Sequence, residues 1–506
     1  FDIPDFDPQV GDIKGVWEAS RFTWSLQLAK AASQENAQAG IRLNVWMANW
    51  LQHNAPYKGV NWKCGQEASI RVMHLAIAAK LMGQVYNTQQ PLLALIKAHL
   101  ARIAPTISYA LAQDNNHGTS EAAALYVGGS WLVANGDKTA EKWRRRGEYW
   151  LRNRAKRLIL PDGSFSQASL NYHRLMLDTF CVAEVWRRSL NLPAFHRDVY
   201  QQLSLAMVWL RTMVQSATGD APNLGANDGA HLIPLANTDY RDFRPTVQLA
   251  ANLFVGASAY KEDGEWDDAL TWLGVEKSNE TLQPLASKDF ADGGYATLRR
   301  GAAFVLLRYP MFRFRPSQCD ALHLDYWVNG INVLRDGGTY SYNAGEQYID
   351  YYGGVQGHNV IEFDGHPQMP RLSRFLLARW LKTRWKSGLA DGAPYSYGAS
   401  YSDQFGCCHK RVVKLTANGL RVVDSISGVK EKAVLRWRLK PGNWHKSDTV
   451  FETDNYSIRV ISSTRIVRAD IVNGYESRYY YKQTRLPVIE VEVAESCEIT
   501  TELYLK

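Results

Sequence analysis

The sequence predicts an α+β chain of two domains, a helical domain followed by an antiparallel β-sandwich. Apolar residues recur with the period of an α-helix up to about residue 285. Beyond about residue 290 they alternate or run in strand-length pieces. A polar segment at residues 278–292 separates the two patterns. Because helices followed by strands are typical of α+β chains, we predict a helical domain at 1–285 and a β-sandwich at 286–506.

The helical half shows its period most clearly in four segments, at residues 70–81, 91–103, 119–132 and 203–214. Short connections rich in Gly, Pro, Asn and Asp occur at 54–56, 161–163 and 222–225. Repeated helix pairs without a strand signal predict an array of α/α hairpins. The pattern alone leaves open whether the array closes on itself.

The second half shows strand-length apolar pieces at residues 302–308, 412–415, 434–439, 458–461 and 488–493. Ala417-Asn418-Gly419-Leu420 lies between two such pieces and is a strong hairpin signal. Short strands with turns about every ten residues indicate a β-sandwich.

Composition bounds the class of protein. With 506 residues, 46% of them hydrophobic and 21% charged, the chain can bury a large core. No run of about 18 apolar residues is present, so we expect no membrane span. The chain starts at Phe1 without a basic and apolar leader, which leaves secretion open. Six cysteines form no CxxC pair, and the neighbouring Cys407 and Cys408 are interpreted as structural.

Charge favours an anionic partner. The net charge is +8, spread along the chain, and the one short basic run at 144–146 suits a solvated helix face. No nucleic-acid motif is visible, so nucleic acid is not the expected partner. The 17 Trp and 26 Tyr suit sugar stacking, although most belong in the core. We expect an acidic polysaccharide.

Two polar motifs interrupt the helical half. Asn116 and His117 stand in the first, Asp114-Asn115-Asn116-His117-Gly118. The second, Asn171-Tyr172-His173-Arg174, follows 55 positions later (172 − 117) behind a Pro-Asp-Gly-Ser turn. Crowded polar groups at helix ends cost stability unless they are satisfied, so they often mark a site. Two capped helix starts with incidental polar residues are the alternative.

A third cluster opens the β half. Residues 315–325 carry Arg315, Gln318, His323 and Asp325, and residues 334–342 and 357–360 follow. Alternation along strands would place several of these side chains on one sheet face. One or two buried ion pairs would be the structural alternative.

Taken together, these motifs make the chain resemble the heparinase II/III-like polysaccharide lyases. The resemblance rests on the order and spacing of Trp17 to Arg21, Gly59 to Trp62 with Glu67 and Arg71, Asn115 to His117, Asp162 to His173, Asn223 to Gly229, Asp336 to Tyr342, and His358-Asn359. It implies a toroid of α/α hairpins followed by an antiparallel β-sandwich. It also implies β-elimination at a uronic acid, and a periplasmic or secreted bacterial enzyme.

The resemblance assigns roles to residues. Asn116 and His117 would hydrogen-bond the uronate carboxylate and stabilise the charge that develops on it. Tyr172 would be the base, its pKa lowered by Arg174 or by a protonated His173. His323 is a further catalytic candidate. The expected substrate contacts are His173, Arg174, Arg315, Gln318, Arg335, Tyr340 and Tyr342.

The chain departs from the family where many relatives carry His-x-His or His-x-Gln. Pro316 and Gln318 occupy these positions, so the first histidine is missing. His323 could replace it, although on an ordinary strand it would face away from Gln318. Gln318, Asp336 and His358 match the metal ligands but make a poor zinc set. We therefore expect no required cofactor and a hydrogen-bonded cluster, with structural zinc or calcium as the alternative.

The expected function is cleavage of a uronate-containing polysaccharide, such as a bacterial exopolysaccharide or an alginate-like or heparosan-like chain. Few Arg or Lys stand near the motifs, which favours a substrate without sulfate. A glycan-binding protein that has lost catalysis is the first alternative, because of Pro316. A glycoside hydrolase is the second, with Asp114, Glu121, Asp162 and Asp228 as carboxylates. The sequence leaves linkage, endo or exo action and oligomeric state open.

Overall fold

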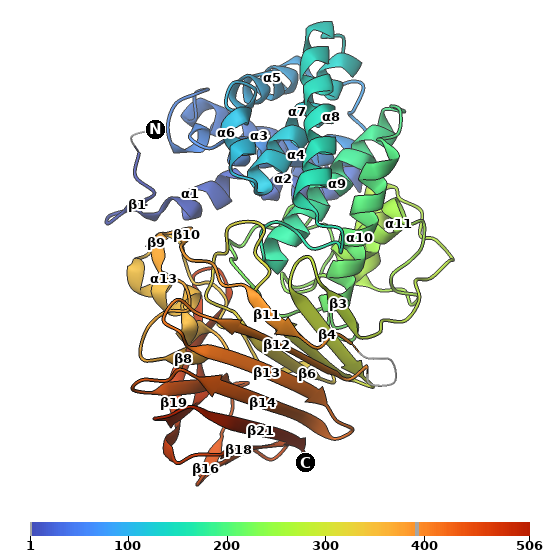
Figure 1. Ribbon diagram of the computed structural model, residues 1–506. Coiled ribbons are helices and arrows are strands. Elements are labelled where there is room, and N and C mark those ends of the chain that lie inside the picture. The colour runs from blue at the N-terminus through green and yellow to red at the C-terminus, as the bar shows by residue number, and fades with distance from the viewer. Residues whose placement is uncertain (1–2, 390–393) are drawn as a thin grey trace. The chain divides into compact units, whose positions relative to one another are not determined.

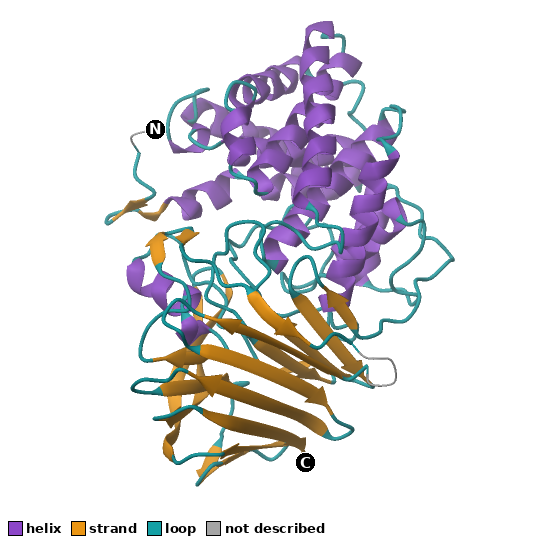
Figure 2. Ribbon diagram, viewed as in Figure 1, coloured by secondary structure: helices purple, strands orange, loops and turns teal. Residues whose placement is uncertain are grey.

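The computed structural model describes residues 3–389 and 394–506 (Figure 1). The chain divides into two compact units. The helical unit comprises the chain up to Ser166, Tyr172–Arg211 and Ala230–Leu282. The sheet unit comprises Gln167–Asn171, Thr212–Gly229 and Gln283–Lys506. Helices first and strands afterwards is the order that the sequence predicts (Figure 2).

Helices build almost all of the first unit. A short hairpin of β1 (Phe6–Asp7) and β2 (Gly11–Asp12) precedes them. The helices are α1 (Ile13–Ser20), α2 (Thr23–Ser33), α3 (Ala37–His53), α4 (Gly65–Leu81), α5 (Gln90–Ile103), α6 (Ile107–Ala112), α7 (Asn116–Ala134), α8 (Glu141–Leu158), α9 (Leu170–Ser189), α10 (Arg197–Met213), α11 (Arg244–Phe254) and α12 (Asp268–Leu273). The four segments with the clearest helical period lie in α4, α5, α7 and α10, and α10 ends one residue before 214.

Helices α7 and α8 form a tight antiparallel hairpin because glycines let their backbones approach. A Cβ at Gly129 would lie 2.5 Å from the Arg144 nitrogen, and one at Gly147 would lie 2.3 Å from the Tyr126 nitrogen. Both contacts leave no room for a side chain. Since the later residue of α7 meets the earlier residue of α8, the two helices run in opposite directions.

Helix α9 packs against α7 through a pair of buried tryptophans. Trp131 and Trp186 meet edge to face with ring centroids 5.2 Å apart, and the Trp186 indole donates to the Ser130 hydroxyl at 3.1 Å. Such edge-to-face pairs are favoured by the charge distribution of aromatic rings. This contact fixes one end of α9 against α7.

The sheet unit holds three larger antiparallel sheets and one small one (Figures 1 and 2). Its strands are β3 (Lys288–Phe290), β4 (Tyr295–Arg300), β5 (Ala303–Arg308), β6 (Leu324–Val328), β7 (Ile331–Leu334), β8 (Ile361–Phe363), β9 (Arg371–Ser373), β10 (Leu376–Leu377), β11 (Thr383–Lys386), β12 (Ser396–Ser402), β13 (Cys408–Leu415), β14 (Gly419–Ser427), β15 (Ala433–Arg438), β16 (His445–Ser447), β17 (Val450–Glu452), β18 (Tyr456–Ser462), β19 (Ile466–Tyr479), β20 (Lys482–Val493) and β21 (Cys497–Leu505), with one helix, α13 (Glu346–Gly353). The five-stranded sheet has the order β3-β4-β5-β6-β7, the four-stranded sheet β19-β20-β15-β8, and the eight-stranded sheet β11-β12-β13-β14-β21-β18-β17-β16. One apolar core draws residues from all three, among them Val305, Leu435 and Val413.

The hairpin predicted at Asn418-Gly419 is confirmed. Leu415 of β13 pairs with Leu420 of β14, and the Thr416 amide donates to the Gly419 carbonyl at 2.9 Å. Gly419 has φ +156°, and a Cβ there would lie 1.8 Å from the Leu503 carbonyl oxygen. Only glycine fits this position.

The strand expected around residues 315–323 is wrong. This segment is irregular, and regular pairing begins only at Leu324 in β6. Pro316 lacks an amide hydrogen, and Leu322 has φ +64°, a conformation that a strand does not contain. The Gln368 side chain takes the place of a strand partner: it accepts from the Ala321 amide and donates to the Ala321 carbonyl, both at 3.0 Å. The alternation argument that placed Gln318 and His323 on opposite faces therefore does not apply.

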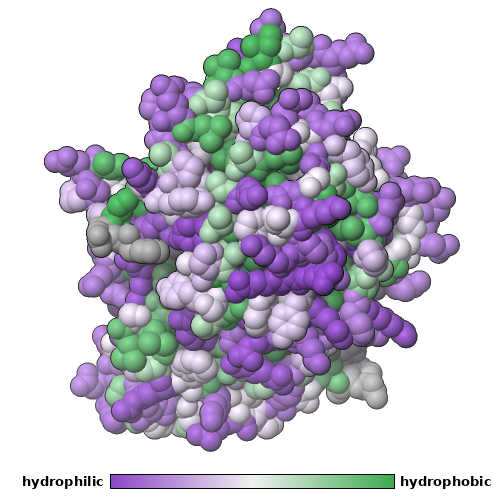
Figure 3. All heavy atoms as spheres, turned by 90° about the horizontal axis from the view of Figure 1, so that it is seen from above, coloured by the Kyte–Doolittle hydropathy of each residue, from purple (hydrophilic) through white to green (hydrophobic). Residues whose placement is uncertain are grey.

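The surface carries no large apolar area on the face that Figure 3 shows: it is mostly hydrophilic, with separate hydrophobic patches. Exposed apolar side chains such as Trp46, Tyr109 and Tyr149 are distributed over different helices. Among the described residues, no helix is long and apolar enough to cross a membrane.

Candidate active site

Asn116 and His117 begin α7. The Asn115 side chain caps the helix by accepting from the His117 amide at 3.0 Å. Asp114 stands before this cap at φ +49° and pairs with Arg157 at 2.7 Å and with Arg154 at 3.2 Å. Hydrogen bonding from Arg157 lowers the pKa of Asp114 despite partial burial. Asp114 is therefore ionised and anchors the turn that presents Asn116 and His117.

Tyr172 lies in the first turn of α9, where it is 9% exposed. The Pro-Asp-Gly-Ser turn before it is held by Asp162, which accepts from the Ser164 amide at 2.9 Å and from the Ser164 hydroxyl at 2.6 Å. Gly163 has φ +92°, and a Cβ there would lie 2.1 Å from the Leu205 carbonyl oxygen. The turn that the sequence indicates is thus present just ahead of α9.

The starts of α7 and α9 lie together. The Ser166 hydroxyl, four residues before α9, donates to the Asp114 carbonyl at 3.0 Å. At the other end, Trp131 (15 residues after Asn116) meets Trp186 (14 residues after Tyr172). Because contacts near both ends match in register, α7 and α9 run parallel. Their N-termini, which carry partial positive charge, are therefore at the same end of the helical unit, together with Asn116, His117 and Tyr172.

His173 does not behave as expected. Its ring is fully buried, stacks on Trp209 at 4.5 Å between ring centroids, and makes a hydrogen bond through Nε2 to the Ala206 carbonyl at 2.9 Å. Burial lowers the pKa of His173 to about 4. The ring is neutral at neutral pH, so it does not supply the positive charge that we expected beside Tyr172.

Arg174 is also buried within the helical unit. Its guanidinium lies 4.3 Å from the Tyr240 ring centroid and 4.5 Å from that of Phe243, and it donates to the Tyr240 carbonyl. Its exposed fraction is 1%. We therefore leave His173 and Arg174 out of the proposed substrate contacts, since both side chains pack the interior.

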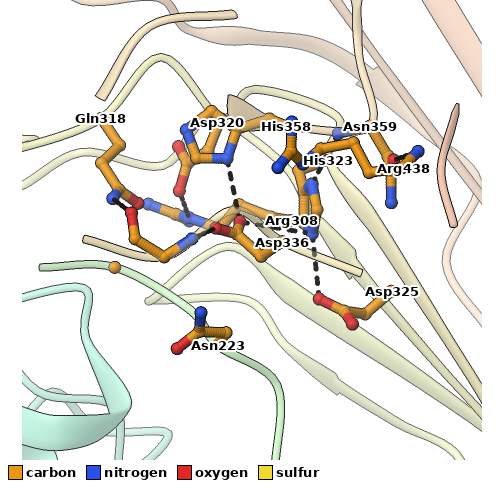
Figure 4. A network of polar contacts seen from close by, with 12 residues as sticks. Asn223, Arg308, Gln318, Asp320, His323, Asp325, Asp336, His358, Asn359 and Arg438 are labelled. Atoms are coloured by element: carbon orange, nitrogen blue, oxygen red, sulfur yellow. Dashed lines mark hydrogen bonds and ion pairs between the residues drawn. The ribbon is translucent and has the colours of Figure 1, made fainter. Parts of the chain in front are cut away.

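The sheet unit gathers a second group of polar side chains around Asp336 (Figure 4). His358 Nδ1 is 2.9 Å from Asp336 Oδ2, and His323 Nε2 is 3.5 Å from the same oxygen and 3.0 Å from Asp325 Oδ2. These four side chains are completely buried. Burial alone would raise the pKa of Asp336, but His358 and His323 hold it below its usual value.

The hydrogen bonds of His323 do not suit a metal ligand. The Asn359 amide donates to His323 Nδ1 at 2.9 Å, so the ring proton must be on Nε2, where it points to Asp325 and Asp336. A metal at Nε2 would require a ring without any proton. His323, Asp336 and His358 bring ligand atoms within 4.8 Å of one another, but these hydrogen bonds leave His323 Nε2 without a lone pair for a metal. Calcium suits the two imidazoles even less, because it prefers oxygen ligands.

The other expected substrate contacts of the sheet unit have different surroundings. Arg335 is 8% exposed, and its Nη1 donates to both carboxylate oxygens of Glu476, at 2.8 and 3.0 Å. Gln318 is buried; its Nε2 donates to the Gly338 carbonyl at 3.4 Å, and its Oε1 has no hydrogen-bond partner within residues 3–389 and 394–506. Arg315 is exposed. Arg335 is thus neutralised by Glu476, whereas Arg315 remains at the surface.

Tyr340 and Tyr342 belong to an aromatic cluster that the sequence did not reveal. Tyr340 packs on Tyr348 (4.4 Å between centroids) and on Tyr481 (5.6 Å), while Tyr342 packs on Tyr480 (5.7 Å). Both are half-buried. Tyr480 and Tyr481 come from the β19–β20 hairpin, some 140 residues further along, so only their adjacent aromatic letters hinted at a role.

The carboxylates of the hydrolase alternative have separate tasks. Asp114 and Asp162 hold turns, and Asp228 accepts from the side-chain nitrogen of Asn171 at 3.1 Å. Glu121 is 3% exposed, and burial raises its pKa to about 8, so it is a neutral acid at neutral pH. It lies over Gly65 at the start of α4, where a Cβ would be 2.3 Å from its Oε1.

Comparison with known proteins places the chain in a family. The model of the heparinase II/III N-terminus matches residues 10–215, and that of the heparinase II/III-like C-terminal region matches residues 282–486. The chain belongs to the heparinase II/III-like family, and it is a polysaccharide lyase. A comparison with curated protein sequences gives no match.

Solved structures share the fold at low identity. A crystal structure of heparinase III matches with TM-score 0.70 and 17% identity over 96% of this chain and 76% of the other. The heparan sulfate lyase of Pedobacter heparinus matches with TM-score 0.61 and 19% identity, over 100% and 79%. The chondroitin AC lyase of Streptomyces coelicolor matches with TM-score 0.56 and 12% identity, over 99% and 75%. The predicted fold class, a helical toroid followed by a β-sandwich, is confirmed.

Proposed function

We propose that this lyase cleaves a uronic-acid-containing polysaccharide by β-elimination. The reaction removes the hydrogen at C5, breaks the C4–O4 bond and leaves a double bond between C4 and C5. It needs a group that stabilises negative charge on the C5 carboxylate, a base for the C5 hydrogen and an acid for O4. The observation that carries the proposal is the shared position of the α7 and α9 starts, tied by Ser166 and Asp114.

Asn116 and His117 are proposed to bind the carboxylate. Both stand at the first turn of α7, where the helix end favours an anion. A neutral amide and an imidazole that donate hydrogen bonds would stabilise the enolate-like charge as it forms. Asn116 is only 4% exposed, so water competes weakly for its amide.

Tyr172 is proposed as the base and, in its protonated form, as the acid. A phenolate at the start of α9 would gain from the helix end, and the same oxygen can return the proton to O4 when both groups leave from one face. Since His173 is neutral and Arg174 faces Tyr240, the partial positive charge of the helix ends is proposed to favour the phenolate.

The substrate is proposed to be a polymer without sulfate, such as a bacterial exopolysaccharide or an alginate-like or heparosan-like chain. Of the arginines near the motifs, Arg174 is buried on aromatic rings and Arg335 is paired with Glu476. Dense sulfate would call for more uncommitted cations than these. Such a substrate would be met in the periplasm or outside the cell, which cell fractionation can test.

The test is digestion of a panel of polyuronates and bacterial exopolysaccharides while the absorbance of the unsaturated uronate is followed. A rising absorbance with one member of the panel supports the proposal. Reducing ends without that absorbance would indicate hydrolysis and contradict it. Binding of an acidic glycan without cleavage would select the catalytically impaired alternative, which the missing histidine at Pro316 favours.

A further inference from the structure

Two loops of the sheet unit bring together a group of side chains that can bind metal, far along the chain from the motifs above. Asp364 and His366 follow β8, and Cys407 lies in the turn between β12 and β13. One ligand atom from each lies within 4.8 Å of the other two. Asp403, at the start of the same turn as Cys407, brings its Oδ2 to 4.0 Å from His366 Nε2. Nitrogen, oxygen and sulfur donors of this kind are those of zinc sites.

Both aspartates are oriented by backbone amides that occupy one carboxylate oxygen. Asp403 Oδ1 accepts from the Phe405 amide at 2.8 Å and from the Cys407 amide at 2.9 Å, which leaves Oδ2 on the side of His366. Asp364 Oδ1 accepts from the Glu431 amide at 2.8 Å and from the Lys432 amide at 3.0 Å. Its Oδ2 has only one long contact, to the Lys430 amide at 3.3 Å. Metal ligands are commonly held in this way by groups behind them.

Among the residues that the structure describes, neither nitrogen of the His366 imidazole has a hydrogen-bond partner, although both atoms are buried. Its ring is held instead by Phe405, with ring centroids 4.0 Å apart. Buried polar atoms without partners are rare in proteins, because each loses its hydration without compensation. A metal ion bound at one nitrogen would supply the missing partner.

Cys407 is fully buried, and its thiol makes a weak hydrogen bond from Sγ to the Gly428 carbonyl at 3.3 Å. Gly428 has φ +82°, and a Cβ there would lie 2.5 Å from the Gly406 carbonyl oxygen, so the loop that carries this carbonyl needs glycine. The loop then provides the amides of residues 430–432 to Asp364. Burial raises the pKa of the Cys407 thiol to about 11, so a metal would have to displace its proton.

We propose that Asp364, His366, Asp403 and Cys407 bind one zinc ion. The site would join β8 of the four-stranded sheet to the β12–β13 turn of the eight-stranded sheet. Its role is to stabilise the sheet unit, and it does not depend on the proposed substrate. It also accounts for Cys407 of the adjacent cysteine pair, since the neighbouring Cys408 contacts Ser402 at 3.0 Å instead.

The experiment loads the full chain with Co²⁺ in place of Zn²⁺ and records the near-ultraviolet band of a cobalt–thiolate bond. No thiol belongs to the group at Asp336, so this band reports on a cysteine site alone. Wild type and Cys408→Ser should both show the band and bind one metal per chain by elemental analysis. Cys407→Ser should lose the band, and His366→Ala should bind metal at least ~10-fold more weakly. His445→Ala, at an exposed histidine of β16, is the matched control and should bind as wild type does.

Several outcomes would overturn the proposal. They are a wild-type chain that shows no thiolate band, a band that persists in Cys407→Ser, or one that disappears in Cys408→Ser. If Cys407→Ser does not fold, the comparison of His366→Ala with His445→Ala decides by itself. Metal removal from the wild type should also lower its melting temperature, and the same chelator should leave that of folded His366→Ala unchanged.

Discussion

The hydroxyl of Ser166 donates a hydrogen bond to the backbone carbonyl of Asp114 across 52 positions of sequence, at 3.0 Å. This bond joins the loop before α9 to the turn before α7. It places the first turn of α9, which carries Tyr172, at the same end of the helical unit as Asn116 and His117. The two polar motifs thereby become one candidate site, whose parts can be tested singly.

Tyr172→Phe should abolish elimination while the chain still binds glycan and folds. Only the phenolic oxygen is lost, and a base in this role is worth at least ~100-fold in rate. Initial rates of double-bond formation, with a melting curve as the control for folding, measure the effect. Near wild-type turnover in this variant would remove Tyr172 from the mechanism.

Asn116→Ala should lower turnover by ~10²–10³-fold and weaken substrate binding much less. The amide is proposed to act on charge that develops only in the transition state. Turnover is measured as kcat in the wild type and in Asn116→Ala. Substrate binding is measured as the dissociation constant in the inactive Tyr172→Phe variant, with and without Asn116→Ala. Equal and modest losses in both would make Asn116 a ground-state contact.

Ser166→Ala should misplace Tyr172 relative to α7 and cost between ~10- and ~100-fold in kcat/KM. The loss of one buried hydrogen bond should cost only about 1 kcal/mol of stability. Ser164→Ala is the matched control, because the Ser164 hydroxyl bonds to Asp162 within the same turn and not to the α7 side. If the two variants lost activity equally, the bond to Asp114 would not be what positions the site.

His323→Ala should lower the melting temperature and leave activity per folded molecule unchanged. Its ring is fully buried and hydrogen-bonded at both nitrogens. Its removal takes one partner from Asp325 and Asp336, which should lower the free energy of unfolding by about 3–5 kcal/mol. Thermal unfolding and turnover corrected for the folded fraction measure the two quantities. A steep loss of turnover without destabilisation would show instead that His323 replaces the histidine missing at Pro316.

Stability should fall as the pH drops from about 6.5, because several histidines are buried in neutral form. His99 is the clearest example: its Nε2 accepts from Arg71 at 2.8 Å, and burial together with the Arg71 charge lowers its pKa to about 3. In the unfolded chain the pKa of histidine is ~6.5, so between these values unfolding takes up a proton. The contribution of His99 is therefore complete above pH 6.5 and decreases towards pH 3.

His99→Gln tests this, since its amide oxygen can accept from Arg71 but cannot be protonated in this range. The free energy of unfolding in urea, compared at pH 6.5, 5.5 and 4.5, should decrease less steeply than in the wild type, by up to about 1.4 kcal/mol per pH unit. The slope is the readout, so a general loss of stability does not affect the conclusion. Parallel slopes would show that His99 is not the titrating group.

The sequence by itself determined the local structure and the class of protein. The helical period of residues 70–81 and the Asn418-Gly419 turn each set a backbone conformation through neighbouring residues, and both are present. The polar motifs at Asn116 and Tyr172 stand at helix starts, and the Asn115 cap of α7 is formed by neighbouring residues. These residues also carried the resemblance to the family that the comparisons show.

Only the tertiary structure decided which polar side chains are buried and which partners they contact. His173 and Arg174 follow Tyr172 directly, yet contacts with Trp209 and Tyr240 bury both. The segment at 315–323 is irregular because Gln368, some 47 positions away, replaces a strand partner. The group at Cys407 combines the loop after β8 with the β12–β13 turn, which lie some 40 positions apart in the sequence. Such long-range pairings depend on how whole elements pack, and a pattern of neighbouring residues does not contain that information.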